Sequence, residues 1–344
     1  MAGLSPMMTH YLETKKEYPD CLLFYRLGDF YEMFFDDAVT VSRELEITLT
    51  GKECGLEERA PMCGVPHHAV ETYLNRLVQK GFKVAIAEQM EDPKQAKGLV
   101  KREVIRVVTP GTVTSAMALD ETKNNYLMGI VYIGETFGIA VTDITTGDFL
   151  VTEVGSDREL TDEINKFSPS EIICNEAFYV SGVDIEEIRN RYHAVISSLD
   201  NHFFSDEICR NILKEHYKVG SLSGLGLEDY DTGIIASGAV MQYMYETQKN
   251  SLSHITTITP YSTSQFMIID TSTRRNLELL ETLREKQKRG SLLWVLDRTK
   301  TAMGARLLRT YIEQPLIHKA DIIKRQTAVE ELNMNYISRE EILS

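Results

Sequence analysis

Phe30 and Glu32 are the residues whose types and spacing point most directly to recognition chemistry. They follow an apolar run with strand character and the turn-forming pair Gly28-Asp29. At such a turn the backbone can hold side chains out toward a partner. An exposed ring can wedge between base steps of a duplex, at a cost of about a few kcal/mol that is lower where pairing is already defective. A carboxylate two residues away can accept a hydrogen bond from a ring N–H of the displaced base. The alternative is a core Phe30 and a solvated helix charge at Glu32.

Basic side chains between residues 80 and 106 are candidates for contacts to the DNA backbone. Phosphate binding rests on Lys and Arg, and this is the densest basic stretch of the first part of the chain. Acidic residues interleave with it, so a solvated surface of mixed charge is the alternative. The candidates are Lys80, Lys94, Lys97, Lys101, Arg102 and Arg106. A later basic group, which includes Arg274, Arg275 and Lys286, is expected to pair with glutamates on helix surfaces.

Carboxylates in the middle of the chain raise a rival function. Asp143 ends a predicted strand, and a two-metal nuclease would use strand and helix carboxylates to hold Mg²⁺. Its possible partners are Asp162 and Glu163 on the following predicted helix and Asp231 on a later one. The ordinary explanation is a turn in an acid-rich surface, because a fold by itself does not imply a function.

Cys54, Cys63, His67 and His68 suggest zinc, but their spacing does not fit a zinc site. Structural zinc sites space paired ligands two to four positions apart, whereas the pattern is C-x8-C-x3-H-H. We predict no metal site, a turn at the two histidines and a core position for Cys63. The 5 cysteines are scattered and odd in number, which favours reduced thiols over a disulfide framework.

The elements that must position these residues begin with a small mixed α/β domain over 1–113. Ser5-Pro6 is typical of a helix start, and strand patterns lie at 21–27, 47–49, 83–88 and 104–109. Apolar residues recur near the helical period from Met33 onward, which predicts a helix with Phe30 and Glu32 at its start. A further helix is predicted over 70–80.

Two more parts follow in the sequence. Residues 114–264 begin with three strand-like runs separated by turn signals, and Ser156 then opens a capping box before a helix. The order βββαβα resembles the ribonuclease-H-like fold. From residue 265 to 344 apolar residues follow helical spacing only, including Leu277, Leu280 and Leu283. This all-helical part has no closing element, so we expect the chain to be the N-terminal portion of a longer protein.

The charge of the chain is distributed unevenly. The net charge is -14, and we count 14 basic and 17 acidic residues in 1–115, 9 and 23 in 116–264, and 14 and 11 in 265–344. A nucleic-acid contact is therefore expected from the first or last part, and protein partners from the acidic middle. No apolar run reaches about 18 residues, and the N-terminus lacks an apolar signal core, so we expect a cytoplasmic protein with no membrane contact.

Several long runs, in order along the chain, resemble the MutS family of bacterial mismatch-repair proteins. The recognition domain of that family is similar to LLFYRLGDFYEMF at 22–34, PMCGVPHHAV at 61–70, AIAEQ at 85–89 and RVVTPGT at 106–112. The start of its helical core resembles DTSTRRNLEL at 270–279. Isolated F-x-E would be uninformative, whereas ordered blocks over the whole chain are specific.

The resemblance implies functions for individual residues and partners. Phe30 takes the base-stacking role and Glu32 the hydrogen-bonding role, on duplex DNA that carries mispairs or small loops. The middle domain is implied to be a connector that docks the downstream factor MutL, and 265–344 the first part of a helical lever region. A protein-interaction scaffold remains a further alternative.

The family's ATPase, which uses ATP and Mg²⁺, needs a glycine-rich phosphate loop. Here Gly51-Lys52 is followed by Glu53, with no glycine five positions before Gly51. We therefore expect no cofactor and no catalysis in this chain. We also expect a monomer, although the full-length family member forms a homodimer, and a cytoplasmic bacterial protein that associates with the nucleoid when acting.

Overall fold

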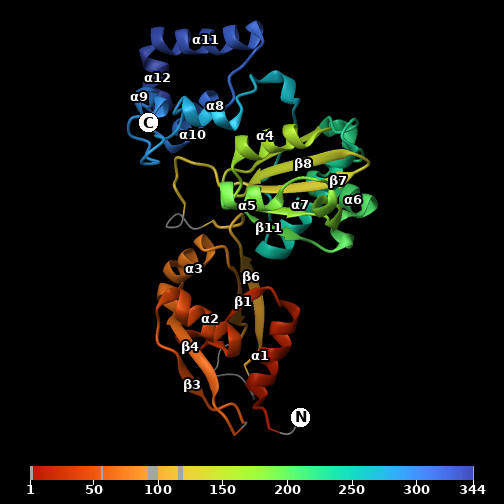
Figure 1. Ribbon diagram of the computed structural model, residues 1–344, viewed down its shortest axis with the longest axis vertical. Coiled ribbons are helices and arrows are strands. Elements are labelled where there is room, and N and C mark those ends of the chain that lie inside the picture. The colour runs from red at the N-terminus through yellow and green to blue at the C-terminus, as the bar shows by residue number, and fades with distance from the viewer. Residues whose placement is uncertain (1–2, 56, 92–99, 115–118, 344) are drawn as a thin grey trace.

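The computed structural model describes residues 3–55, 57–91, 100–114 and 119–343. Two α/β units and a helical tail follow one another along the long axis of the molecule, with the N-terminus at one end and the helices of the tail at the other (Figure 1). Among the described residues, no helix combines the length and apolar character needed to cross a bilayer.

The first unit is a sheet between helices. In the described residues its six strands have the order β3-β4-β2-β1-β5-β6. One apolar cluster joins the sheet to α1, and another joins its opposite face to α2 and α3. The elements are α1 (Pro6–Glu17), β1 (Cys21–Leu27), β2 (Phe30–Phe34), α2 (Phe35–Leu45), β3 (Thr50–Lys52), β4 (Ala60–Pro66), η1 (His67–Ala69), α3 (Val70–Gln79), β5 (Lys83–Gln89) and β6 (Arg102–Val108).

The segment that carries Phe30 and Glu32 differs from its prediction. It is strand β2, and the helix begins only at Phe35, so neither residue lies at a helix start. The apolar residues Met33 and Phe34 fit both a helical stripe and a strand, and pairing with β1 and β4 decides for the strand. The strand predicted at 47–49 is also wrong, because the paired strand β3 begins only at Thr50.

The second unit has the strand order of a ribonuclease-H-like sheet. In the described chain the order is β11-β10-β7-β8-β9-β12, with β7, β8 and β9 antiparallel and β10 parallel to β7. Helix α7 packs so closely on β7 that a Cβ at Gly129 would lie 2.5 Å from Val240 Cγ2. The elements are β7 (Leu127–Ile133), β8 (Thr136–Asp143), β9 (Asp148–Val154), α4 (Asp157–Phe167), β10 (Glu171–Cys174), η2 (Glu176–Val180), α5 (Ile185–Tyr192), β11 (Val195–Ser198), η3 (Asn201–Phe204), α6 (Asp206–Tyr217), η4 (Leu222–Leu225), α7 (Asp231–Gln248) and β12 (Thr259–Pro260).

The tail is helical, as its spacing predicts, but its first predicted helix is wrong. The chain leaves helix α8 at Asn276, and residues 277–291 run through turns and bends, so Leu277 to Leu283 do not form a helical stripe. The elements are η5 (Thr263–Gln265), α8 (Thr271–Asn276), α9 (Leu292–Leu296), α10 (Ala302–Glu313), α11 (Lys319–Met334) and α12 (Tyr336–Leu343).

A buried polar contact fixes the first unit on the second. The Glu171 carboxylate is fully buried and lies 3.2 Å from Lys83 Nζ of β5, and it accepts a 2.7 Å hydrogen bond from the Tyr243 hydroxyl. The backbone N–H of Gly111 donates to the same carboxylate at 3.0 Å, and a Cβ there would come within 2.9 Å of Glu171 Cβ. Because burial of a charge is costly without such partners, this arrangement favours one orientation of the two units.

Candidate nucleic-acid interface

A tight hairpin places the candidate recognition residues at the end of the sheet. Strands β1 and β2 pair with Leu27 opposite Phe30, so Gly28 and Asp29 alone make the turn. Gly28 has a φ of 59°, a left-handed conformation that glycine adopts without steric cost. On the other side, the His67 N–H donates to the Asp29 carbonyl at 2.9 Å and ties the turn to the end of β4. The loop that presents Phe30 is therefore held from both neighbouring strands.

Phe30 and Glu32 lie on the same face of the sheet, because side chains two positions apart along a strand share a face. Their neighbours Tyr31 and Met33 point to the opposite face and are buried in its core. Helix α1 covers the inner end of the first face, where Phe34 is buried against Tyr11. It leaves the outer end open, and Phe30 is 47% exposed there. Phe30 is thus a surface ring and not a core residue.

Gly64 on β4 provides the flat surface beside these two side chains. It pairs with Glu32, and a Cβ at Gly64 would lie 3.6 Å from Glu32 Cγ and 3.8 Å from Phe30 Cδ1. The absence of a side chain at this position leaves the approach to Phe30 and Glu32 free from that side.

Glu32 has a partner that sequence reasoning missed. Lys52 on β3 places its Nζ 2.5 Å from Glu32 Oε2, and both side chains are partly exposed. The same ammonium lies 5.6 Å from the centre of the Phe34 ring. The two residues are 20 positions apart with no pattern that links them, so only the order β3-β4-β2 brings them together. The carboxylate is therefore compensated in the absence of a ligand.

A second pair of charges supports the strand from its core side. The Tyr31 hydroxyl donates to Glu88 on β5, and Arg26 lies 3.5 Å from the same carboxylate and over the Tyr31 ring. Burial and then the Glu88 carboxylate raise the pKa of Tyr31. Tyr31 therefore remains a neutral hydrogen-bond donor, and this cluster fixes β2 next to the exposed Phe30 at its outer end.

The candidate backbone contacts differ in their availability. Lys80 lies 3.1 Å from Glu44, Lys101 2.6 Å from Glu103 and Arg106 3.1 Å from Glu71. These are surface ion pairs, in which interleaved acids compensate the basic side chains. Lys94 and Lys97 lie outside the described residues.

Arg102 has a different environment from the other basic candidates. It is buried, donates to the Arg26 and Val100 carbonyls and stacks on the Tyr25 ring. This arrangement does not leave Arg102 free to meet a phosphate, since its donors hold strands β1 and β6 together.

Carboxylates that a nuclease would need for metal binding form ion pairs and hydrogen bonds within the second unit. Glu163 pairs with Lys166 and accepts from Tyr261, and Asp231 pairs with Arg210. Asp143 is fully buried and receives hydrogen bonds from Asn124 Nδ2, from the N–H of Asn125 and from both donors of Thr145. Within the described residues no three carboxylate, imidazole or thiol side chains gather in a way that could hold a metal ion.

Residues of the zinc hypothesis lie in the core and in a turn. Cys63 is a core residue, as predicted, and its thiol donates to the Ala38 carbonyl at 3.4 Å. Burial raises the pKa of Cys63 to about 12, which keeps the thiol protonated in this core. His67 and His68 form the short turn η1.

Three family models match the chain. They describe MutS domain I over residues 5–117, MutS domain II over residues 125–256 and MutS domain III over residues 272–344. Among curated relatives, the DNA mismatch repair protein MutS of Lachnoclostridium phytofermentans is 63% identical over 342 residues, which is 99% of this chain and 37% of that protein. The MutS protein of Ruminiclostridium cellulolyticum is 54% identical over 344 residues, 99% of this chain and 39% of that protein. The chain thus spans less than two fifths of the length of these relatives.

Proposed function

Because this chain belongs to the MutS family of DNA mismatch repair proteins, we propose that its first unit binds double-stranded DNA at mispairs or small loops and kinks it there. The observation that carries this proposal is the half-exposed Phe30 at the open end of β2, with the Glu32 carboxylate beside it on the same face. A ring in this position has no packing role to explain it, since Phe30 belongs to neither of the two apolar clusters of the unit.

Phe30 acts as a wedge between base steps. Insertion of an apolar side chain from the minor groove unstacks a step at a cost of about a few kcal/mol, and a mispaired step resists less. The stacking of the ring on a base returns about 1–3 kcal/mol. The balance therefore favours insertion at a defect over insertion at a matched pair, which is the source of discrimination.

Glu32 then changes its partner from Lys52 to the displaced base. A partly exposed ion pair is worth about 0.2–1 kcal/mol, so a hydrogen bond from a base N–H to the carboxylate can replace it. The freed Lys52 ammonium is then available to a nearby phosphate. In DNA without a defect no such donor is offered, and Glu32 remains with Lys52.

The remaining assignments rest on the family and on the charges. We divide the chain into a mismatch-recognition domain over 1–113, a connector over 114–264 and the first part of a lever domain over 265–344. The acidic connector is the proposed docking surface for MutL. ATP and Mg²⁺ binding, and dimerisation, are assigned to the parts of the longer relatives that this chain does not cover.

Fluorescence anisotropy with labelled duplexes tests the proposal. The purified chain is titrated with a matched duplex, a G·T duplex and a one-base bulge at several salt concentrations. We expect tighter binding to both defective duplexes, and a loss of affinity for all three as salt rises. Equal affinity for the three duplexes at every salt concentration would refute the function. Duplex cutting in Mg²⁺ that disappears in Asp143→Asn would favour the nuclease instead.

A further inference from the structure

A side-chain hydrogen bond holds the turn that presents Phe30. The Nε of Arg26 donates to the carbonyl of Gly28, the first residue of the two-residue turn between β1 and β2. The tip of this turn is open, because in the described part of the chain a Cβ at Gly28 would meet no atom within 4 Å. Hydrogen bonds, and not apolar contacts, therefore hold the backbone at this tip.

The bonded carbonyl belongs to the peptide that distinguishes two conformations of such a turn. Gly28 has a positive φ of 59° and Asp29 does not have a positive φ, which is the pattern of a type II′ turn. In a type I′ turn both central residues have positive φ, and the peptide between them is rotated. The Arg26 bond to the Gly28 carbonyl holds this peptide in its type II′ orientation. Because Asp29 leads directly into Phe30, rotation of the peptide would aim the ring in another direction.

Arg26 is itself held from two neighbouring strands. It pairs with Tyr31 of β2, and its guanidinium lies 5.5 Å from the centre of the Tyr31 ring. On the other side, Arg26 Nη1 lies 3.5 Å from Glu88 Oε1 of β5, which also accepts a hydrogen bond from the Tyr31 hydroxyl. The side chains of Arg26 and Glu88 are only 14% and 23% exposed. Since water screens this ion pair less than a fully exposed one, Glu88 fixes the position of the guanidinium.

Arg26 reaches the turn from the face of the sheet that does not carry Phe30. Side chains directly opposite each other on paired strands share a face, so Arg26 lies on the same face as Tyr31. Phe30 and Glu32 project from the other face, because side chains alternate along a strand. The path from Arg26 to the Phe30 ring therefore runs through the backbone of the turn.

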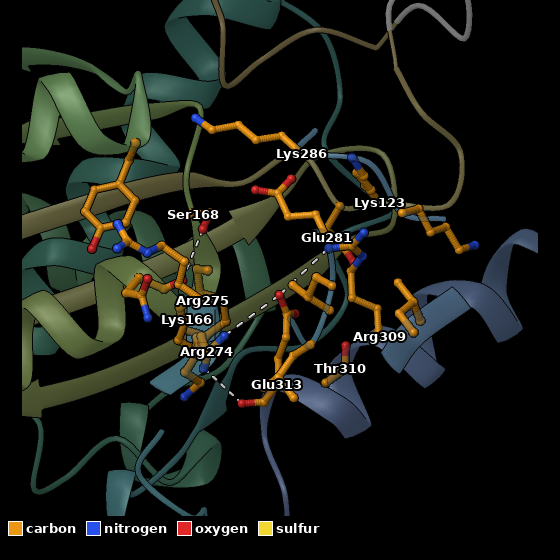
Figure 2. Close-up of a pocket in the computed structure, with 18 of the residues that line it drawn as sticks. Lys123, Lys166, Ser168, Arg274, Arg275, Glu281, Lys286, Arg309, Thr310 and Glu313 are labelled. Atoms are coloured by element: carbon orange, nitrogen blue, oxygen red, sulfur yellow. Dashed lines mark hydrogen bonds and ion pairs between the residues drawn. The ribbon is translucent and has the colours of Figure 1, made fainter. Parts of the chain in front are cut away.

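A second arginine makes the same kind of bond in a different setting. In the pocket between the connector and the tail, Arg274 donates to the carbonyls of Ile269 at 3.2 Å and of Glu313 at 2.9 Å, and Figure 2 shows it directed at Glu313. Arg274 thereby joins the segment before α8 to the end of α10. The Arg26 bond reaches a carbonyl only two residues away, so it joins no separate elements and acts on the shape of the turn alone.

From these observations we propose that Arg26 is a positioning residue for mismatch recognition, which holds the Gly28–Asp29 peptide so that the Phe30 ring points outward for insertion into the duplex. Glu88 and Tyr31 hold the guanidinium in turn. This inference rests on the proposed wedge role of Phe30 and adds a residue that acts on the ring through the backbone. The alternative role for an arginine at this place is a phosphate contact, for which the positive charge alone is sufficient.

Arg26→Lys separates these two roles. It keeps the charge and replaces the guanidinium, which reaches both the Gly28 carbonyl and Glu88, with a single nitrogen. By anisotropy, the ratio of affinities for G·T and matched duplexes should fall by about 3- to 10-fold, less than on removal of the stacking ring. The dependence of affinity on salt should stay the same. A folded Arg26→Lys variant with the full parental ratio would overturn the proposal and favour the phosphate contact.

Two further variants sharpen this result. Glu88→Gln keeps an acceptor for the Tyr31 hydroxyl and removes the charge that holds Arg26, so it should lower the ratio in the same direction by a smaller factor. Arg43→Lys makes the same chemical change as Arg26→Lys at an exposed arginine of α2, whose ion pair is with the adjacent Glu44. This control should keep the parental ratio.

Insertion of the ring can be followed separately from affinity. Aminopurine, a fluorescent adenine analogue, becomes brighter when it loses its stacking, and we place it beside a one-base bulge. In complexes saturated with protein, the rise in fluorescence should be smaller for Arg26→Lys than for the parent chain and for Arg43→Lys, and smallest for Phe30→Ala. An equal rise for Arg26→Lys and the parent chain would contradict a positioning role.

Hydrogen–deuterium exchange of the DNA-free chain tests the turn by itself. Loss of the Arg26 bond should speed exchange in peptides that cover residues 27–31 by several-fold, with no change in peptides from α2 or α3. Faster exchange throughout the first unit, or a large fall in its melting temperature, would make Arg26 a residue that supports the whole fold and would overturn the proposal. A parent chain that does not prefer defective duplexes would refute the proposed function instead, and exchange would still show whether Arg26 holds the turn.

Discussion

Glu32 and Asp143 are both strand carboxylates that the sequence singles out, yet they have opposite surroundings. Asp143 is fully buried at the end of β8, and four donors from the adjoining turns and loop hold it. Glu32 lies on an open face with Lys52 as its ion-pair partner among the described residues. A carboxylate whose acceptor sites are filled by several donors of its own domain supports the fold, whereas one held by a single exchangeable ion pair can meet a ligand.

Among the substitutions that test this comparison, Asp143→Ala is expected to have the largest effect, which is a loss of stability. Removal of the carboxylate leaves the partly buried N–H groups of Asn125 and Thr145 without this acceptor, at up to about 1–3 kcal/mol for each. We expect the connector of this variant to melt at a much lower temperature than that of the parent chain. The ratio of affinities for G·T and matched duplexes should stay the same. Circular dichroism melting and anisotropy measure the two quantities.

Asp229→Ala is the control for that substitution, because Asp229 is an exposed acid of the same domain. It should leave the melting temperature unchanged. A folded and equally stable Asp143→Ala protein would show that the four hydrogen bonds do not support the fold and would reopen the question of a catalytic Asp143.

The next effect concerns Phe30 and its buried neighbour on the same strand. Phe30→Ala removes the stacking surface, and stacking of an aromatic ring on a base is worth about 1–3 kcal/mol. The ratio of affinities for G·T and matched duplexes should therefore fall by roughly 10-fold or more. Because the ring is half-exposed, the melting temperature should barely change.

Met33→Ala provides the opposite case on the opposite face of β2. Met33 is fully buried, and truncation of such a residue costs about 2–5 kcal/mol of stability. If Phe30→Ala lost as much stability as Met33→Ala, or kept full discrimination, the recognition role of Phe30 would be wrong.

A smaller effect is expected from the ion pair of Glu32 and Lys52. Glu32→Ala removes negative charge near the phosphates, so every duplex should bind more tightly while the gap between G·T and matched DNA narrows. Lys52→Met leaves the carboxylate uncompensated and should weaken binding to every duplex. In a double-mutant cycle the DNA-free stability should show coupling of about 0.2–1 kcal/mol, typical of exposed pairs.

Lys16→Met controls for the loss of a positive charge, since Lys16 is an exposed lysine of α1. It should weaken the binding of all duplexes less than Lys52→Met does. Additive effects of Glu32→Ala and Lys52→Met on DNA binding would contradict a partner exchange at the carboxylate.

The smallest effect is expected at two adjacent basic residues with different burial. Lys101→Gln should lower the slope of log affinity against log salt by about 1 and leave duplex preference unchanged, as the loss of one phosphate contact would. Arg102→Gln should lower the melting temperature of the first unit, because Arg102 holds two strands. An unchanged salt slope for Lys101→Gln would show that Lys101 makes no phosphate contact and serves only in its ion pair with Glu103.

Much of the architecture is determined by local pattern in the sequence. Strands β1 and β5 and helices α3 and α4 lie where apolar runs, capping residues and turn signals predict them. Ser156 caps α4 through the N–H of Glu159, as its capping box predicts. These signals are local, since a side chain two to four positions away supplies the partner.

What the tertiary structure alone decided is which side chains meet and which remain free. Pairing with β1 and β4 made Phe30–Phe34 a strand, although its apolar residues fit a helix equally well. The same pairing placed Lys52 on Glu32 and turned the ring of Phe30 outward. Arg102, one of a row of similar cations, was buried because its guanidinium lies over the ring of Tyr25 on β1, two strands away in the sheet. Such contacts join residues far apart in sequence, so their energies depend on sheet order and burial, which no local pattern contains.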